Sequence, residues 1–239
     1  MQACAKSILQ AGNLYMFVMH NPIMFIDPLG LMSWVFYCAG DFHNQAVAEA
    51  GRLGNDTRLI PVWTLDDFIA GWDYMIEFGE ITNVSMIFHG SPFTITFIDE
   101  QNRFTFLTSS NQSITPRGAA AFYIGDLQTA TIGGRLNIMT CNGGHINFIN
   151  SNAQFRELGF YHNFAVSFLV NHNVAKVFGM DGNLSFTRFL NYFPRLSRDQ
   201  GSFHSWSPPR WRPGNRQPEG KVMFFYNRRG NIAFLPMWW

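Results

Sequence analysis

The sequence predicts an α/β fold: a three-layer sandwich in which a mostly parallel sheet has helices on both faces, with β-hairpins added. From Trp34 onward, short apolar runs alternate with segments of helical spacing, which is the pattern of parallel sheets. Hydrophobic residues make up 47% of the 239 residues and charged residues only 14%, enough to build a sizeable core. Two of the apolar runs end in His-Gly or in Cys-Asn-Gly, and ligands bind at the carboxyl ends of the strands in such sheets.

Composition also excludes several classes of protein. The net charge of +1 argues against a nucleic-acid footprint over the whole chain, which would need a basic face. No apolar stretch is long enough to span a membrane, and no signal peptide is evident. The three cysteines, Cys4, Cys38 and Cys141, form no disulfide framework, and the chain contains neither CxxC nor HExxH. We therefore expect no metal and no cofactor.

The first elements after residue 31 alternate between strand and helix. Strands are predicted over Trp34–Cys38 and Arg58–Trp63, with a helix over His43–Arg52 between them that stops at Gly54. Thr64 is the predicted N-cap of a second helix. The apolar residues of that helix recur at helical spacing: Phe68, Ile69, Trp72, Met75 and Ile76.

The middle of the chain begins with the strand Val84–Phe88, which leads into His89 and Gly90. A β-hairpin at a sheet edge is then predicted over Pro92–Ile98 and Arg103–Leu107. The segment 108–134 is polar and glycine-rich, with a short helix expected near Pro116–Tyr123.

The second half begins with the strand Leu136–Thr140, which leads into Cys141. A helix over Ala153–Val170 and a strand over Ala175–Gly179 are predicted next. Residues 197–220 are rich in Pro, Arg, Ser and Gly and predict a long loop. The strands Lys221–Tyr226 and Ile232–Leu235 form a closing hairpin.

Cys141 and His89 are the candidate catalytic pair, because each follows a predicted buried strand. A thiol needs a base or a lowered pKa to become a nucleophile, and histidine is the side chain that titrates near neutral pH. The alternative for Cys141 is a buried structural cysteine, and for His89 a histidine in a turn. If a helix begins soon after Cys141, its N-terminus favours the thiolate.

Other residues near the same edge are weaker candidates. His145 is a rival base, since on a helix it would share a face with Cys141. Asp181 follows a later strand, where it would select a basic substrate side chain or simply form an Asp-Gly turn. His43 would shape the pocket or lie in solvent. Cys38 lies inside the first strand and is expected to be structural.

The N-terminal residues 1–31 have a different pattern, with the turn sequences Asn21-Pro22 and Asp27-Pro28-Leu29-Gly30. The 19 residues NLYMFVMHNPIMFIDPLGL resemble the end of an Rhs/YD-repeat core, which typically closes with NLYxYVxNNPxxxxDPxGL. The resemblance implies a core remnant over 1–31 and a separate toxin domain over 32–239, with a processing boundary between Leu31 and Met32. The upstream aspartate that such cores use for self-cleavage is absent from Cys4–Ile8.

That resemblance has further implications for partners and location. An Rhs core encloses its toxin in a β cocoon, so the core itself is an expected partner, together with an immunity protein. The chain would be secreted or delivered into a target cell, where its substrate is a protein.

Over about residues 33–187, the order of elements resembles the caspase-like fold of the clan CD cysteine peptidases. The motifs behind this resemblance are His89-Gly90 and Cys141-Asn142-Gly143, each at a strand end. The resemblance implies that Cys141 attacks a scissile carbonyl, that His89 handles the proton, and that the backbone N–H groups of Gly90 and Cys141 form the oxyanion hole. The alternatives are a Cys-His deamidase, another Rhs toxin activity such as ADP-ribosyl transfer, or a non-catalytic binding module.

Overall fold

The structure, a computed structural model, describes residues 32–98, 103–110, 120–145, 163–182, 184–187, 193–196 and 220–237. The chain divides into two units, Met1–Leu31 and Met32–Trp239, and every described residue belongs to the second. The segment that resembles an Rhs core, with Leu31, lies outside the described residues. So does the predicted loop 197–220, except for its last residue.

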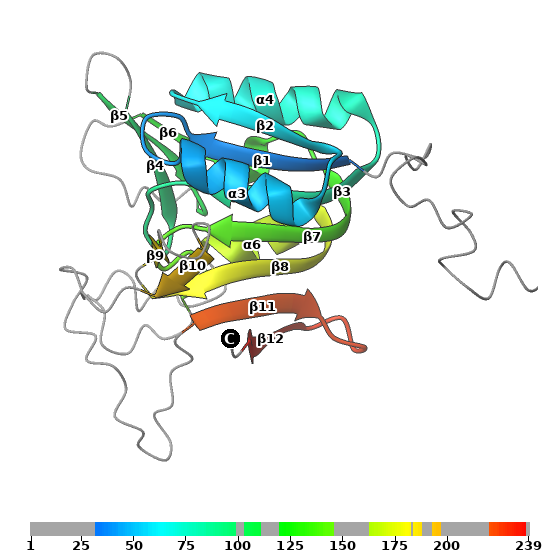
Figure 1. Ribbon diagram of the computed structural model, residues 1–239. Coiled ribbons are helices and arrows are strands. Elements are labelled where there is room, and N and C mark those ends of the chain that lie inside the picture. Colours follow the sequence, from blue (N-terminus) through cyan, green and yellow to red (C-terminus); the bar gives the residue numbers. More distant parts are fainter. Residues whose placement is uncertain are drawn as a thin grey trace, which may run out of the picture. The chain divides into compact units, whose positions relative to one another are not determined.

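A seven-stranded sheet forms the centre of the second unit (Figure 1). In spatial order the strands are β12 (Ile232–Met237), β11 (Gly220–Tyr226), β8 (Asn173–Asp181), β7 (Thr131–Met139), β3 (Ile81–Ile87), β1 (Met32–Cys38) and β2 (Thr57–Val62). Neighbouring strands are parallel from β8 to β2, β11 is antiparallel to β8, and β12 is antiparallel to β11. The predicted α/β class with a mostly parallel sheet is therefore confirmed, and the closing hairpin of β11 and β12 adds two strands at one edge of this sheet.

Helices cover both faces of this sheet, as the alternating pattern predicted. Alternation along β1 sends Val35 and Tyr37 to one face, where they pack with Ala46 of α3 (His43–Leu53). The intervening Trp34 and Phe36 join a larger cluster on the other face. That cluster includes the buried residues of α4 (Leu65–Phe78) and α6 (Phe164–Asn171). The α3 face is the one that carries the candidate site.

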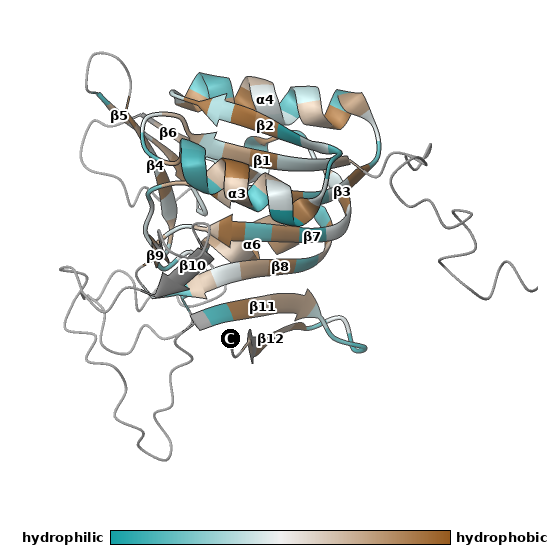
Figure 2. Cartoon of the chain, in the orientation of Figure 1, coloured by the Kyte–Doolittle hydropathy of each residue, from teal (hydrophilic) through white to brown (hydrophobic). Residues whose placement is uncertain are grey.

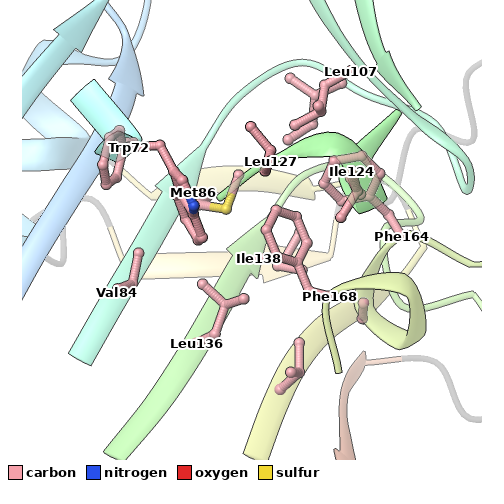
Figure 3. Packing of buried hydrophobic residues seen from close by; sticks show 14 of the residues in the cluster. Trp72, Val84, Met86, Leu107, Ile124, Leu127, Leu136, Ile138, Phe164 and Phe168 are labelled. Carbon is pink, nitrogen blue, oxygen red and sulfur yellow. The ribbon is translucent and has the colours of Figure 1, made fainter. Parts of the chain in front are cut away.

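The larger cluster is the main core of the unit (Figure 3). Trp72 of α4 is fully buried and packs against Phe168 of α6, with their ring centroids 5.6 Å apart. Its indole N–H donates a hydrogen bond to the Gln128 carbonyl at 2.9 Å, so the one polar atom of the side chain has a partner. Removing a buried aromatic side chain of this kind costs about 3–5 kcal/mol.

Local sequence determines where the helices begin. The Thr64 hydroxyl accepts the Asp67 N–H at 3.1 Å and the Asp67 carboxylate accepts the Thr64 N–H at 2.9 Å, a complete capping box. The predicted N-cap is thus confirmed. Hydrophobic and hydrophilic residues lie side by side along α3 and α4, as expected of helices with one buried face (Figure 2). No helix in the described ranges is long and apolar enough to cross a membrane.

Three element predictions need correction. The hairpin of β4 (Thr94–Ile98) and β5 (Phe104–Thr108) is present, but with β6 (Ala120–Tyr123) it forms a separate three-stranded sheet rather than an edge of the main one. The described part of the helix predicted near Pro116–Tyr123 is therefore strand, followed by a 3-10 turn over Ile124–Asp126. The third correction is to the helix predicted over Ala153–Val170: its residues 153–162 lie outside the described residues, and Asn163 precedes the helix, which begins at Phe164. It begins there because the Asn163 side chain caps it, accepting the Val166 N–H at 2.8 Å.

Two further differences concern strands. The strand that leads to Cys141 begins at Thr131, within the segment predicted to be a polar loop. Gly134 allows this, because a Cβ there would lie 2.5 Å from the Thr82 carbonyl oxygen at a register shift. A two-stranded sheet of β9 (Leu184–Thr187) and β10 (Phe193–Leu196) was not predicted.

Candidate functional site

His89 and Cys141 follow two neighbouring parallel strands at matching positions. In the pairing of β3 with β7, Ile87 lies opposite Met139, and each candidate residue comes two residues later. The Phe88 N–H donates a hydrogen bond to the Met139 carbonyl at 3.3 Å, so the two segments of the chain stay side by side just beyond the strands. Both candidates therefore leave the sheet at its carboxyl edge, next to one another in register.

Gly90 shows how closely the two chain segments approach. A Cβ on Gly90 would lie 3.1 Å from Cβ of Thr140, the residue before Cys141, and 2.7 Å from the Thr94 carbonyl oxygen. A larger residue at position 90 would push apart the segments that bear His89 and Cys141. Close packing therefore explains why a glycine follows His89, independently of any catalytic role for Gly90.

The exposed His89 imidazole has a carboxylate partner from a third strand. Its Nε2 lies 2.8 Å from Oδ2 of Asp41, which follows β1. The Phe42 ring packs against the imidazole with centroids 4.8 Å apart. Asp41 was not among the predicted site residues, because its contact with His89 spans 48 positions in sequence. The sequence contains one indication of a role for Asp41, which is its position just beyond β1, the strand that pairs with β3.

The Cys141 thiol is partly buried under β9. Its Sγ accepts the Leu184 N–H at 3.3 Å. Burial raises the pKa of the Cys141 thiol above its ordinary value, and the Leu184 N–H opposes that rise. Within the described residues, which stop at His145, Cys141 is followed by a turn over residues 141–144 and not by a helix N-terminus. The thiol is therefore less ionised in this arrangement than the sequence suggested.

Both candidate side chains lie on the α3 face of the sheet. Leu184 and Phe186 of β9 pack on the small cluster beneath α3, as does Phe42. The Phe186 ring lies 5.8 Å from the Phe42 ring, which in turn contacts His89. The rings of Phe186, Phe42 and His89 are thus in continuous contact. They connect β9, which covers the thiol, with the imidazole.

The turn after Cys141 is fixed to the end of β8. Asn142, at φ 57°, donates its N–H to the Gly182 carbonyl at 2.8 Å. Gly144 donates to the Met180 carbonyl at 2.9 Å. A Cβ on Gly144 would lie 2.6 Å from the carbonyl carbon of Gly179, so the two backbones are in direct contact. Only glycine permits this approach.

The rival base His145 and the candidate Asp181 lie inside the fold. His145 Nδ1 is 2.7 Å from Asp181 Oδ1, with the two side chains 4% and 0% exposed. The Asn163 amide, at the start of α6, donates to the His145 carbonyl at 2.8 Å. This geometry gives the pair a role in holding the Cys141 turn against β8, because neither side chain faces solvent.

The remaining candidates have clear positions. His43 is exposed at the start of α3, with Nδ1 3.1 Å from the Tyr37 hydroxyl. Cys38 is partly buried against the main core, and burial is the first cause of its raised thiol pKa, with the Asp41 charge a smaller one. Met32, the residue after the predicted processing boundary, is the first residue of β1.

Among the described residues, neither the backbone N–H of Gly90 nor that of Cys141 has a hydrogen-bond acceptor. The next four N–H groups, from Asn142 to His145, all donate within the turn or to the end of β8. In the described ranges, no three His, Cys, Asp or Glu side chains gather as they would around a metal ion. The chemistry that this edge offers is a thiol, an imidazole, a carboxylate and two N–H donors.

Comparison with protein-family models found no match to this chain, and comparison with curated proteins found none either.

Proposed function

We propose that residues 32–239 are a cysteine peptidase of the caspase-like type, with Cys141 as nucleophile and His89 as general base. The supporting observation is the register of β3 and β7, which brings His89 and Cys141 to equivalent positions beyond adjacent parallel strands. The close approach of Gly90 to Thr140 keeps those two positions together. The strand and helix order on which the resemblance rests is also found in the described residues as far as the hairpin of β4 and β5, after which β6 and a 3-10 turn precede β7.

The proposed reaction is acyl transfer. The Cys141 thiol gives its proton to His89, and its sulfur forms a bond to the carbonyl carbon of the substrate. The oxyanion accepts hydrogen bonds from the N–H groups of Gly90 and Cys141, a type of stabilisation that is often the largest catalytic contribution. The C–N bond then breaks as His89 protonates the leaving amine. Water hydrolyses the thioester and regenerates the thiol.

The described arrangement is a resting one under this proposal. The thiol accepts a hydrogen bond from Leu184, and the imidazole contacts Asp41. Substrate entry then requires β9 to move away from Sγ. Loss of that burial would also lower the thiol pKa, because burial is the first cause of its rise.

The wider proposal follows from the DPLGL boundary. The peptidase would be the toxin tip of an Rhs-type protein, enclosed by the core, delivered into a target cell and neutralised there by an immunity protein. Its substrate would be a protein of that cell.

The test uses Cys141→Ala and His89→Ala, each with its folding checked by circular dichroism. We expect both variants to lose toxicity on expression in a host cell, while the matched control Cys38→Ala keeps it. New protein N-termini should accumulate in cells that express the unaltered chain and be absent with Cys141→Ala. Toxicity that survives Cys141→Ala would end the proposal. Toxicity that requires the thiol without new N-termini would favour deamidation.

A further inference from the structure

We propose that Asp41 is a positioning residue for His89, so that the site works as a Cys141–His89–Asp41 triad. The inference rests on the proposed function and goes beyond the Cys-His dyad. Its basis is the 2.8 Å contact between Asp41 Oδ2 and His89 Nε2. Three adjacent strands of the sheet, β1, β3 and β7, would each supply one member of the triad just past its last residue.

The backbone after β1 fixes the position of Asp41. The N–H groups of Asp41 and Phe42 both donate to the Cys38 carbonyl, at 3.2 and 3.0 Å. This tight turn presents the carboxylate and the Phe42 ring to the same imidazole, the ring with its centroid 4.8 Å away. His89 is thus held at Nε2 by the carboxylate and on its face by the phenyl ring.

The contact also determines which ring nitrogen is the base. A carboxylate accepts hydrogen bonds, so it favours the imidazole with its proton on Nε2. Nδ1 is then the nitrogen with a lone pair, free to receive the thiol proton. When His89 takes that proton, the negative charge of Asp41 stabilises the imidazolium. Both side chains are more than half exposed, so solvent limits the size of this effect.

The titratable groups described at this edge of the sheet come from the ends of β1 and β7 and from the start of α3. Cys38 and Asp41 come from the end of β1, His43 begins α3, and Cys141 follows β7. Phe42, Leu184 and Phe186, which line the same face, carry no charge. Asp41 is the only carboxylate with a hydrogen bond to the imidazole in the described ranges.

The experiment is a double-mutant cycle read by alkylation of Cys141 with iodoacetamide, in a chain whose Cys4 and Cys38 are replaced by Ala. Asp41→Asn should slow alkylation about two- to fivefold, the range expected of an exposed charge pair. The same substitution in a His89→Ala background should change nothing, because Asp41 acts only through the imidazole. Asp41→Glu should restore part of the rate, and the exposed control Asp66→Asn should leave it unchanged.

The outcomes separate this inference from the proposed function. If His89→Ala leaves alkylation unchanged, the dyad itself is wrong. If His89→Ala slows alkylation but Asp41→Asn does not, the dyad stands and the positioning role is overturned. An equal effect of Asp41→Asn with and without His89 would also overturn it, because a purely structural role would persist in both backgrounds.

Discussion

Single residues in this chain depend on partners that are distant in sequence. His89 was predicted from its place after an apolar run, but its contact with Asp41 depends on how the turn after β1 folds. The Cys141 environment likewise depends on Leu184, 43 positions away. Residue type and local spacing predicted which side chains reach the sheet edge. They carried no information on which partner each side chain would find there.

His172 provides a prediction about pH. The ring is buried between Trp72 and Phe168, and burial lowers its pKa from 6.5 to about 4. Its Nδ1 accepts the Ala130 N–H at 3.3 Å, so the folded state holds it neutral. Below about pH 6.5 the unfolded chain takes up a proton that the folded chain does not. Stability is therefore complete above that pH and falls progressively as the pH drops toward about 4.

We expect the free energy of unfolding, measured in urea, to fall by about 2 kcal/mol between neutral pH and about pH 5 from this group alone. His172→Gln should have a smaller fall over the same range, because glutamine does not titrate. His43→Gln, a change at an exposed histidine, is the matched control and should leave the slope unchanged. If His172→Gln and the unaltered chain had the same pH slope, this account of His172 would be wrong.

At the scale of elements, β9 is the strand that covers the Cys141 thiol. Leu184 and Phe186 anchor it on the cluster beneath α3. Phe186→Ala should loosen β9, expose Sγ and lower the thiol pKa, so alkylation of Cys141 should become faster, by about tenfold for a shift of one pKa unit. Phe104→Ala, at an exposed position of β5, is the control. Slower or unchanged alkylation would show that β9 does not restrict access to the thiol.

The close backbone contact between Gly144 and Gly179 gives a second prediction at the scale of elements, about how the Cys141 turn packs against β8. A Cβ on Gly179 would lie 2.5 Å from Gly144 Cα, so Gly179→Ala should push the Cys141 turn away from β8. We expect a loss of about 1–3 kcal/mol of stability. Gly51→Ala makes the same chemical change within α3, where a Cβ would meet nothing within 4 Å. It should stabilise the helix by up to about 1 kcal/mol. Equal effects in urea unfolding would contradict this explanation.

Elements with a strong local signal were predicted well. β1 is a continuous apolar run that is buried on both faces, α4 has buried residues at helical spacing, and Thr64 forms the expected cap. β6 was mistaken for a helix because its short sequence has no clear alternation, and it exists by pairing with β5. β9 and the first residues of β7 were missed for the same reason. Gly133 and Gly134 are poor strand residues in isolation, but tertiary contacts hold them in β7.

At the scale of the whole molecule, sheet order determines what the site contains. The sequence predicted parallel strands, but many orders would satisfy that pattern. In the order found, β1, β3 and β7 are consecutive neighbours, so their carboxyl ends meet and bring Asp41, His89 and Cys141 to one edge. The composition of the candidate site therefore follows from topology, which local periodicity does not encode.

The last prediction concerns the boundary at Leu31. β1 begins at Met32 and forms ladders with both β2 and β3, and its residues Trp34–Phe36 are fully buried between the two helical layers. These contacts come from residues after the boundary, so a chain that starts at Met32 retains every interaction described for the sheet. We expect deletion of residues 2–31 to leave the midpoint of thermal unfolding within a few degrees of its original value, equivalent to less than about 1 kcal/mol. The rate of Cys141 alkylation should also be unchanged. A truncated chain that fails to unfold cooperatively would show that the N-terminal segment belongs to the α/β fold and that the boundary lies earlier.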